Sequence, residues 1–314
     1  MQTAFDKNHW ALILGGSSGF GLATAKALAH RGMNVCVVHR DRKGSMPQIE
    51  PHFAELKATG VGVLTVNTDA LSVEGRKQVL DELATRMGPA GKVRLVLHSI
   101  AFGNLKPLAT PKPNAAVSDA VAKLSQQLGV EVTAFSAAVK KAFDAGADVL
   151  APLVETAAPE PGVALEDEDF ARTVHAMGTS LATWVQDVFA RGLFAGDARV
   201  VGLTSEGNEI AWRGYGAVAA AKVALESISR AIAVELGPYG VRSNIVQAGV
   251  TDTPALRLIP GSAQMKADAR LRNPLGRLTT PADVADFICL LATDEARWVN
   301  GALIRVDGGE GVAG

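Results

Sequence analysis

A glycine-rich turn near the N-terminus constrains this chain most. The apolar segment Trp10–Leu14 runs into the sequence Gly-Gly-Ser-Ser-Gly-Phe-Gly, and a helical pattern follows directly. In such a turn Gly15 permits the tight bend, Gly19 lets the backbone approach a pyrophosphate and Gly21 allows the helix to pack closely. The free N–H groups at the start of the helix then face the anion. Because these glycines lie between an expected strand and an expected helix, they predict a dinucleotide-binding site.

Short apolar runs alternate with longer amphipathic patterns along most of the chain. This alternation predicts an α/β fold, a Rossmann-like, doubly wound parallel sheet of about seven strands. The nearly continuous hydrophobicity of each run indicates strands that helices cover on both faces. The expected strands are Trp10–Leu14, Val35–His39, Val61–Asp69, Val93–Ser99, Arg199–Thr204, Val241–Gln247 and Ala302–Val306.

The alternation is interrupted once, between about Asn104 and Asp169. This segment has no clear strand, and its apolar periodicity predicts helices over Ala115–Leu128 and Ala134–Ala145. One helical hairpin is too small to bury a core of its own. We therefore predict a single domain over residues 1–314, with a helical insertion over residues 104–169 after the fourth strand.

Composition excludes several classes of protein. The chain has 31 basic and 32 acidic residues, so it offers no broad positive field for nucleic acid. No apolar stretch is long enough to span a bilayer, and the N-terminus lacks the pattern of a secretory signal, so we expect a cytoplasmic protein with no membrane partner. Cys36 and Cys289 lie in apolar runs, which favours buried thiols over a disulfide or a metal site.

The end of the second expected strand bears on the choice of dinucleotide. NAD-binding folds usually carry an acidic residue there, for the ribose hydroxyls. Here His39 holds that place, and Arg40 and Arg42 follow. Two guanidiniums suit the 2′-phosphate of NADPH through charge-assisted bonds. The alternative is a solvated basic loop whose charge Asp41 partly offsets. We expect NADPH rather than NADH.

A tyrosine and a lysine form the candidate catalytic pair. Tyr215 opens a helical pattern and Lys222 follows almost two turns later, so both side chains share one helix face. We expect the Lys222 ammonium to stabilise the phenolate and so bring the pKa of Tyr215 toward neutrality. Alone, this pair is compatible with an ordinary amphipathic helix. However, the hydroxyls of Thr204 and Ser205 end the fifth expected strand, where doubly wound sheets bind ligands, and can bond a substrate carbonyl.

The order of these motifs resembles the short-chain dehydrogenase/reductase family over about Trp10–Asn104 and Phe170–Gly309. Three features are similar to the enoyl-[acyl-carrier-protein] reductase branch of that family. Six residues separate the tyrosine from the lysine, and the fourth strand ends in Leu97-His-Ser-Ile-Ala-Phe102. Ala248-Gly249 follows the sixth strand, where most members of the family have Pro-Gly.

Two positions depart from the pattern of the family. Ser205 stands where many enoyl reductases carry a second tyrosine. The segment Val174-His-Ala-Met-Gly178 stands where carbonyl-reducing members carry a helix asparagine that holds a proton-relay water. His175 is a conceivable substitute acid, but we interpret it as a helix-packing histidine.

The resemblance implies roles for the site residues. Tyr215 would bond the thioester carbonyl and stabilise an enolate, Lys222 would bond the nicotinamide ribose hydroxyls, and Ser205 completes the catalytic set. Asp69 would bond the adenine edge, and Val250 and the nearby Thr253 would contact the carboxamide end. The expected cofactor contacts are Gly15, Ser17, Ser18, Gly19, Phe20, Gly21, Arg40, Arg42, Asp69, Ala70, Ser99, Ile100, Ala101, Tyr215, Lys222, Gly249, Val250, Thr251 and Thr253.

The function implied by the resemblance is NADPH-dependent reduction of a 2-enoyl thioester of acyl carrier protein or coenzyme A, within fatty acid and lipid metabolism. One alternative is a carbonyl or 3-oxoacyl thioester reductase that uses Ser205, Tyr215 and Lys222. Another is a non-catalytic NADPH-binding sensor or scaffold. The resemblance also implies a homo-oligomer, a tetramer or a dimer. Because the insertion directly follows the fourth strand and has amphipathic helical patterns, we expect it to form a lid or wall over the substrate, or a docking surface for a carrier protein or partner subunit.

Overall fold

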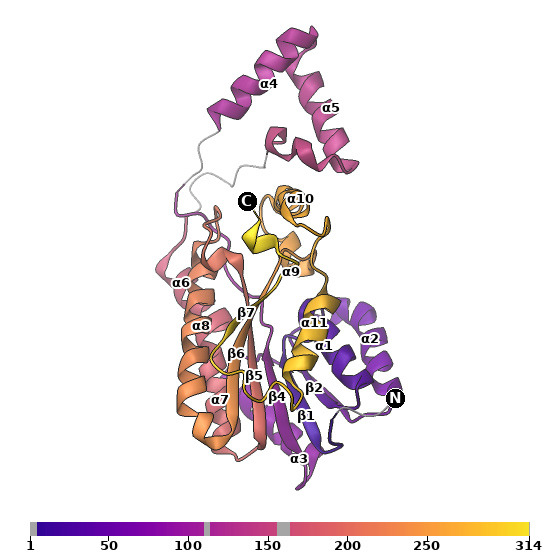
Figure 1. Cartoon of the computed structure of the whole chain (residues 1–314), viewed down its shortest axis with the longest axis vertical. Coiled ribbons are helices and arrows are strands. Elements are labelled where there is room, and N and C mark those ends of the chain that lie inside the picture. Colours follow the sequence, from indigo (N-terminus) through magenta and orange to yellow (C-terminus); the bar gives the residue numbers. More distant parts are fainter. Residues whose placement is uncertain (1–4, 110–113, 156–163, 314) are drawn as a thin grey trace.

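Seven parallel strands form one sheet in the computed structural model, which describes residues 5–109, 114–155 and 164–313 (Figure 1). Their order across the sheet is β3-β2-β1-β4-β5-β6-β7. Every neighbouring pair is parallel, which confirms the predicted Rossmann-like α/β fold. The strands are β1 (His9–Leu14), β2 (Asn34–His39), β3 (Val63–Asn67), β4 (Lys92–His98), β5 (Phe194–Ser205), β6 (Val241–Ala248) and β7 (Leu303–Val306).

The strand order reverses at β1, since the chain adds β2 and β3 on one side and β4 to β7 on the other. The loops after β1 and β4 diverge there, and ligands bind at this carboxyl edge in doubly wound sheets. Two expected strands differ in length by more than one residue. β3 is shorter at both ends than predicted, and β5 begins at Phe194 rather than Arg199. The early part of β5 contains Gly196 and Asp197, which interrupt the apolar pattern that the prediction used.

Helices cover both faces of the sheet (Figure 1). Successive residues of a strand point to opposite faces, so Ala11 and Ile13 of β1 contribute to one buried cluster and Leu12 and Leu14 to the other. The helices of the first face are α1 (Gly19–His30), α2 (Met46–Ala58) and α11 (Pro281–Leu291), and those of the second are α3 (Val73–Met87), α7 (Ser180–Ala190) and α8 (Gly216–Glu235).

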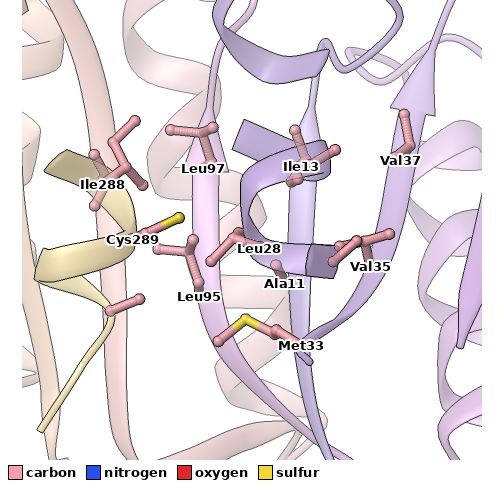
Figure 2. Close-up of a cluster of buried hydrophobic side chains, with 14 of the residues drawn as sticks. Ala11, Ile13, Leu28, Met33, Val35, Val37, Leu95, Leu97, Ile288 and Cys289 are labelled. Carbon is pink, nitrogen blue, oxygen red and sulfur yellow. The ribbon is translucent and has the colours of Figure 1, made fainter. Parts of the chain in front are cut away.

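The core between α1, α11 and the sheet is built from aliphatic side chains (Figure 2). Leu28 of α1 and Ile288 of α11 are fully buried in this cluster. Cys289 belongs to the same cluster and Cys36 to the opposite one, and both are free thiols. Burial raises the pKa of Cys289 to about 12 and also raises the pKa of Cys36. The prediction of buried thiols is confirmed.

Two helices and a 3-10 turn follow β4 before the chain returns to the sheet, and α4 and α5 stand apart from it (Figure 1). The 3-10 turn lies against α10 (Ser262–Arg272), because Phe143 and Ala151 pack on Ala267. Residues 110–113 and 156–163 of the predicted insertion lie outside the described residues. The elements are α4 (Ala115–Leu128), α5 (Val132–Asp144) and η2 (Asp148–Leu153).

Among the described residues, no helix combines the length and the apolar character needed to cross a membrane.

Several shorter elements complete the chain. The helix α6 runs through a π-helical turn, η3, directly into α7. These elements are η1 (Lys43–Ser45), α6 (Asp167–Val174), η3 (His175–Thr179), η4 (Glu206–Asn208), η5 (Gly237–Tyr239), α9 (Pro254–Arg257) and η6 (Glu310–Val312).

Candidate active site

The predicted catalytic side chains meet at the carboxyl edge of the sheet. Ser205 is the last residue of β5 and Tyr215 is the residue before α8. Their hydroxyl oxygens, Oγ and OH, lie 3.3 Å apart. Lys222 is buried in the second turn of α8, and its Nζ donates a hydrogen bond to the Leu203 carbonyl at 2.7 Å. The structure therefore brings together the two hydroxyls, and it fixes the ammonium on the helix that Tyr215 precedes.

The protonation of the pair differs from the prediction. Burial raises the pKa of Tyr215, although the hydrogen bond with Ser205 partly lowers it. We expected the Lys222 ammonium to lower this pKa, so that part of the prediction was wrong. The physical reason is that loss of water around the phenol disfavours the phenolate. Burial lowers the pKa of Lys222 to about 8, with Glu226 opposing the shift. Near neutral pH the phenol keeps its proton and the lysine is largely charged.

A buried carboxylate, Glu226, organises the chain beside Ser205. It lies one helical turn after Lys222 and accepts hydrogen bonds from Thr204 Oγ1 at 2.7 Å and Asn208 Nδ2 at 2.6 Å. The Thr204 hydroxyl is therefore directed toward Glu226. Of the two predicted hydroxyls, only that of Ser205 contacts Tyr215. Sequence reasoning missed Glu226, although its spacing of four residues from Lys222 placed it on the same helix face.

Two histidines lie near the pair. His98 ends β4, is buried, and places its Nε2 2.8 Å from Ser180 Oγ. Burial, with the nearby charge of Lys222, lowers the pKa of His98 to about 3, so the imidazole is neutral. His175 lies in the π-helical turn, where its Nδ1 is 3.3 Å from Thr179 Oγ1. This contact is a local helix interaction, as expected for a packing histidine.

The glycine-rich turn forms a cradle with two other loops. A Cβ on Gly15 would lie 2.5 Å from the Ser99 carbonyl oxygen, so only glycine allows the turn after β1 to pack against the segment after β4. A Cβ on Gly19 would contact the Thr253 methyl at 3.5 Å, across from the loop after β6. Ser18, at the N-terminus of α1, makes no side-chain cap, so the first N–H groups have no capping side chain. These residues fit the pyrophosphate of a dinucleotide.

Arg40 directly follows β2, at the carboxyl edge of the sheet. Its Nη1 donates to Asp69 Oδ2 at 3.1 Å, and its guanidinium lies 4.9 Å from the centre of the Phe102 ring. Asp41 turns its carboxylate to His39 Nδ1 at 2.8 Å. That contact directs the acidic group of the loop inward and leaves Arg40 half-exposed. Asp69, expected at the adenine edge, is thus close to Arg40, and the exposed Arg42 precedes η1.

The remaining expected contacts lie along the same edge. The Val250 N–H donates to the Glu310 carboxylate at 3.1 Å, and Thr253 Oγ1 caps α9 by accepting from the Leu256 N–H. Sequence reasoning missed Glu310, since it lies just beyond Gly309, where the resemblance to the family ends. The other positions are in the β1–α1 turn and the start of α1 (Ser17, Phe20, Gly21), after β3 (Ala70), after β4 (Ile100, Ala101) and after β6 (Gly249, Thr251).

Two family models match the chain. The model described as short chain dehydrogenase matches residues 9–114, and the model described as enoyl-(acyl carrier protein) reductase matches residues 114–310. The chain therefore belongs to the short-chain dehydrogenase/reductase family. It is an oxidoreductase of the kind that uses NAD(P)(H).

Individual relatives cover nearly the whole chain. Cis-4-hydroxycyclohexanecarboxylate dehydrogenase of Sinomonas cyclohexanicum is 27% identical over 95% of both chains. 1-Cyclohexenylcarbonyl-CoA reductase of Streptomyces collinus is 28% identical over 98% of this chain and 88% of the relative. The solved enoyl-[acyl-carrier-protein] reductase (NADH) of Aquifex aeolicus superposes with a TM-score of 0.69 at 23% identity, over 98% of this chain and 97% of that one. This last likeness supports the fold alone.

Proposed function

We propose that the protein reduces the carbon–carbon double bond of a 2-enoyl thioester with NADPH, the acyl group being carried by coenzyme A or acyl carrier protein. When bound, NADPH supplies the hydride, which goes to the β-carbon. The chain's own part is to bind the thioester oxygen and to stabilise the negative charge that develops on it. The Tyr215 hydroxyl, 3.3 Å from Ser205 Oγ at the carboxyl edge of β5, is the donor for that oxygen.

The observation that carries this proposal is the placement of a partly buried, protonated phenol at the start of α8, the helix that also carries the buried Lys222. Tyr215 donates a hydrogen bond to the thioester oxygen, and the bond strengthens as the enolate forms. Because burial raises its pKa, Tyr215 stays protonated near neutral pH and can donate this hydrogen bond, while little phenolate is present to act as a base, which suits reduction better than oxidation of an alcohol. The Streptomyces relative is named as a reductase of 1-cyclohexenylcarbonyl-CoA, a CoA thioester whose ring double bond adjoins the carbonyl, and this agrees with the proposed substrate class.

A second candidate is reduction of a carbonyl or 3-oxoacyl thioester. The observation that favours it is the contact between Ser205 Oγ and Tyr215 OH, because two hydroxyls on one oxygen suit a ketone. The Sinomonas relative is named as a dehydrogenase of a hydroxycyclohexane acid, which is carbonyl chemistry. A sensor or scaffold is the third candidate.

The substrate is tested by following NADPH absorbance with crotonyl and longer 2-enoyl thioesters beside acetoacetyl thioesters. The proposal expects preferential turnover of the enoyl substrates. Turnover of the acetoacetyl thioester alone would assign the protein to the carbonyl-reducing branch. Tight NADPH binding without turnover of either class would favour the sensor.

Arg40 is expected to select NADPH over NADH. Its replacement by alanine removes a charge-assisted partner of the 2′-phosphate, so Kd for NADPH should rise about 10- to 100-fold. Kd for NADH should change less than about threefold, because NADH has no phosphate there. Both constants can be measured by cofactor fluorescence. Lys43→Ala, which removes an exposed cation of the same loop, serves as the control. Equal loss of affinity for both cofactors in Arg40→Ala would contradict this role.

Cofactor binding is expected to weaken as the pH rises through about 8. Lys222, whose pKa burial lowers to about 8, carries its charge below that pH and loses it above. In the proposed role its ammonium donates to the ribose hydroxyls, so Kd for NADPH should rise about tenfold between about pH 7 and about pH 9.5. Circular dichroism at each pH separates this effect from unfolding. A constant Kd over that range in folded protein would refute the proposed role of Lys222.

We also infer a homo-oligomer. The outward face of α8 carries small and apolar residues, including Val223 and Val234, which are 48% and 76% exposed. Such a face permits close helix packing between copies. Light scattering of the purified protein distinguishes a dimer or tetramer from a monomer. A monomer would overturn the inference.

A further inference from the structure

Arg272, the last residue of α10, links two segments that flank the site. Its Nη2 donates to Glu206 Oε1 at 2.5 Å and to Glu310 Oε1 at 2.9 Å. Glu206 follows Ser205 directly in the chain, whereas Glu310 opens η6 near the C-terminus. Both glutamates are buried, and Glu310 is only 1% exposed. A single nitrogen therefore ties together two carboxylates from segments about a hundred residues apart.

Glu310 passes this link on to the loop after β6. Its Oε2 accepts the Val250 N–H at 3.1 Å. A Cβ on Gly249 would lie 2.8 Å from this same oxygen and 2.4 Å from Thr279 Oγ1, so only glycine lets the carboxylate reach the amide. Val250 follows β6 and Ser205 ends the neighbouring strand β5, so Arg272 is linked to Val250 through Glu310 and to the residue next to Ser205 through Glu206.

The negative charges of Glu206 and Glu310 make their close approach depend on the Arg272 cation. Burial and the charge of Glu206 raise the pKa of Glu310, while Arg272 opposes that shift. Without the cation, two buried carboxylates would face each other, which is strongly unfavourable. Arg272 Nε is buried without a hydrogen-bond partner among the described residues, so the two bonds of Nη2 are the ones that hold this side chain.

We propose that Arg272 is a positioning residue that sets the Ser205 hydroxyl and the Val250 amide relative to each other, through Glu206 and Glu310. This role of Arg272 rests on the proposed function only in the choice of substrate for the kinetic test. Misplacing a reacting group by about 1 Å costs about 100-fold in rate, so such a link between loops matters for turnover.

The same helix provides a matched control. Arg270 Nε and Nη2 form two bonds of 2.6 Å each with the Asp148 carboxylate of η2. Arg270→Met therefore removes a paired arginine from α10 without touching the site. Because Nη2 donates both bonds of Arg272, the single ammonium of Arg272→Lys can replace them, whereas Arg272→Met cannot.

The first measurement is hydrogen–deuterium exchange of the peptide that contains the Val250 amide, in the whole protein without substrate. Arg272→Met should speed this exchange about tenfold, because the amide loses its fixed acceptor. Arg272→Lys and Arg270→Met should leave it unchanged. Equal exchange in all variants, or equal acceleration in Arg270→Met, would overturn the proposal. This readout does not depend on knowing the substrate.

The second measurement is steady-state kinetics with the thioester that the wild type turns over. Arg272→Met should lower kcat about 10- to 100-fold and raise Kd for NADPH by less than that, because Val250 is only one of the expected cofactor contacts and the phosphate cradle and Arg40 lie elsewhere. Arg272→Lys should recover most of kcat. A loss of kcat in Arg272→Met no larger than in Arg270→Met would overturn the proposal. If the wild type turns over no thioester, the proposed function fails, and the exchange experiment still tests Arg272.

Discussion

Replacing Tyr215 with phenylalanine is expected to lower kcat about 10²- to 10³-fold, because one donor to the developing oxyanion is lost. The ring remains in place, so packing at the start of α8 and the affinity for NADPH should change little. The substitution should weaken binding of the transition state more than binding of the substrate, because the enolate oxygen carries far more charge than the oxygen of the bound thioester. Single-turnover rates with a 2-enoyl thioester give this step directly.

The other tyrosine provides the control for this substitution. Tyr239 lies in η5, is 62% exposed, and packs its ring against Phe189 at 4.8 Å between ring centres. Tyr239→Phe removes the same atom far from the site and should leave kcat unchanged. If Tyr215→Phe kept kcat within about threefold of the wild type, Tyr215 would not be the oxyanion donor.

Asp197 is expected to be among the most important side chains for stability. It accepts bonds from three arginines, Arg94, Arg199 and Arg242. The side chains of Arg94 and Arg199 are almost fully buried, at 4% and 1% exposed. Although burial alone would raise the pKa of Asp197, these arginines hold it below its usual range. Asp197→Ala leaves buried cations without their shared anion and should destabilise the protein by about 3–5 kcal/mol.

Urea unfolding of the variant measures this loss. The matched control is Asp294→Ala, since Asp294 pairs with Arg94 at 2.8 Å from a position that is 81% exposed. That substitution should cost less than about 1 kcal/mol. A similar small effect of both substitutions would mean that the bonds of Arg94 and Arg199 to the carbonyls at the C-terminal end of α11 suffice to satisfy them.

The features that the sequence predicted depend on residues that lie close together in the chain. Gly15 and Gly19 are recognisable because a strand and a helix adjoin them, and Tyr215 and Lys222 because helix geometry fixes their separation. Apolar periodicity likewise placed β1 and α4. β5 was predicted too short because Asp197 breaks its pattern, although this residue is held by arginines from two neighbouring strands.

The features that sequence did not predict depend on distant segments meeting. Arg272, Glu206 and Glu310 come from three separate stretches, and no local spacing relates them. The pKa of Tyr215 also depends on burial, which the chain acquires only on folding. The contact of η2 with α10 also joins segments that are distant in the chain. The role of the insertion as a lid, wall or docking surface stays a prediction.

Isotope tracing tests the central claim most directly. NADPH deuterated at both C4 positions of the nicotinamide is supplied with crotonyl thioester in ordinary water, and the product is analysed by NMR. Enoyl reduction at this site predicts one deuterium on the β-carbon and a solvent proton on the α-carbon. The contradicting result is an enoyl thioester that gains no deuterium while an acetoacetyl thioester gains it on the new carbinol carbon.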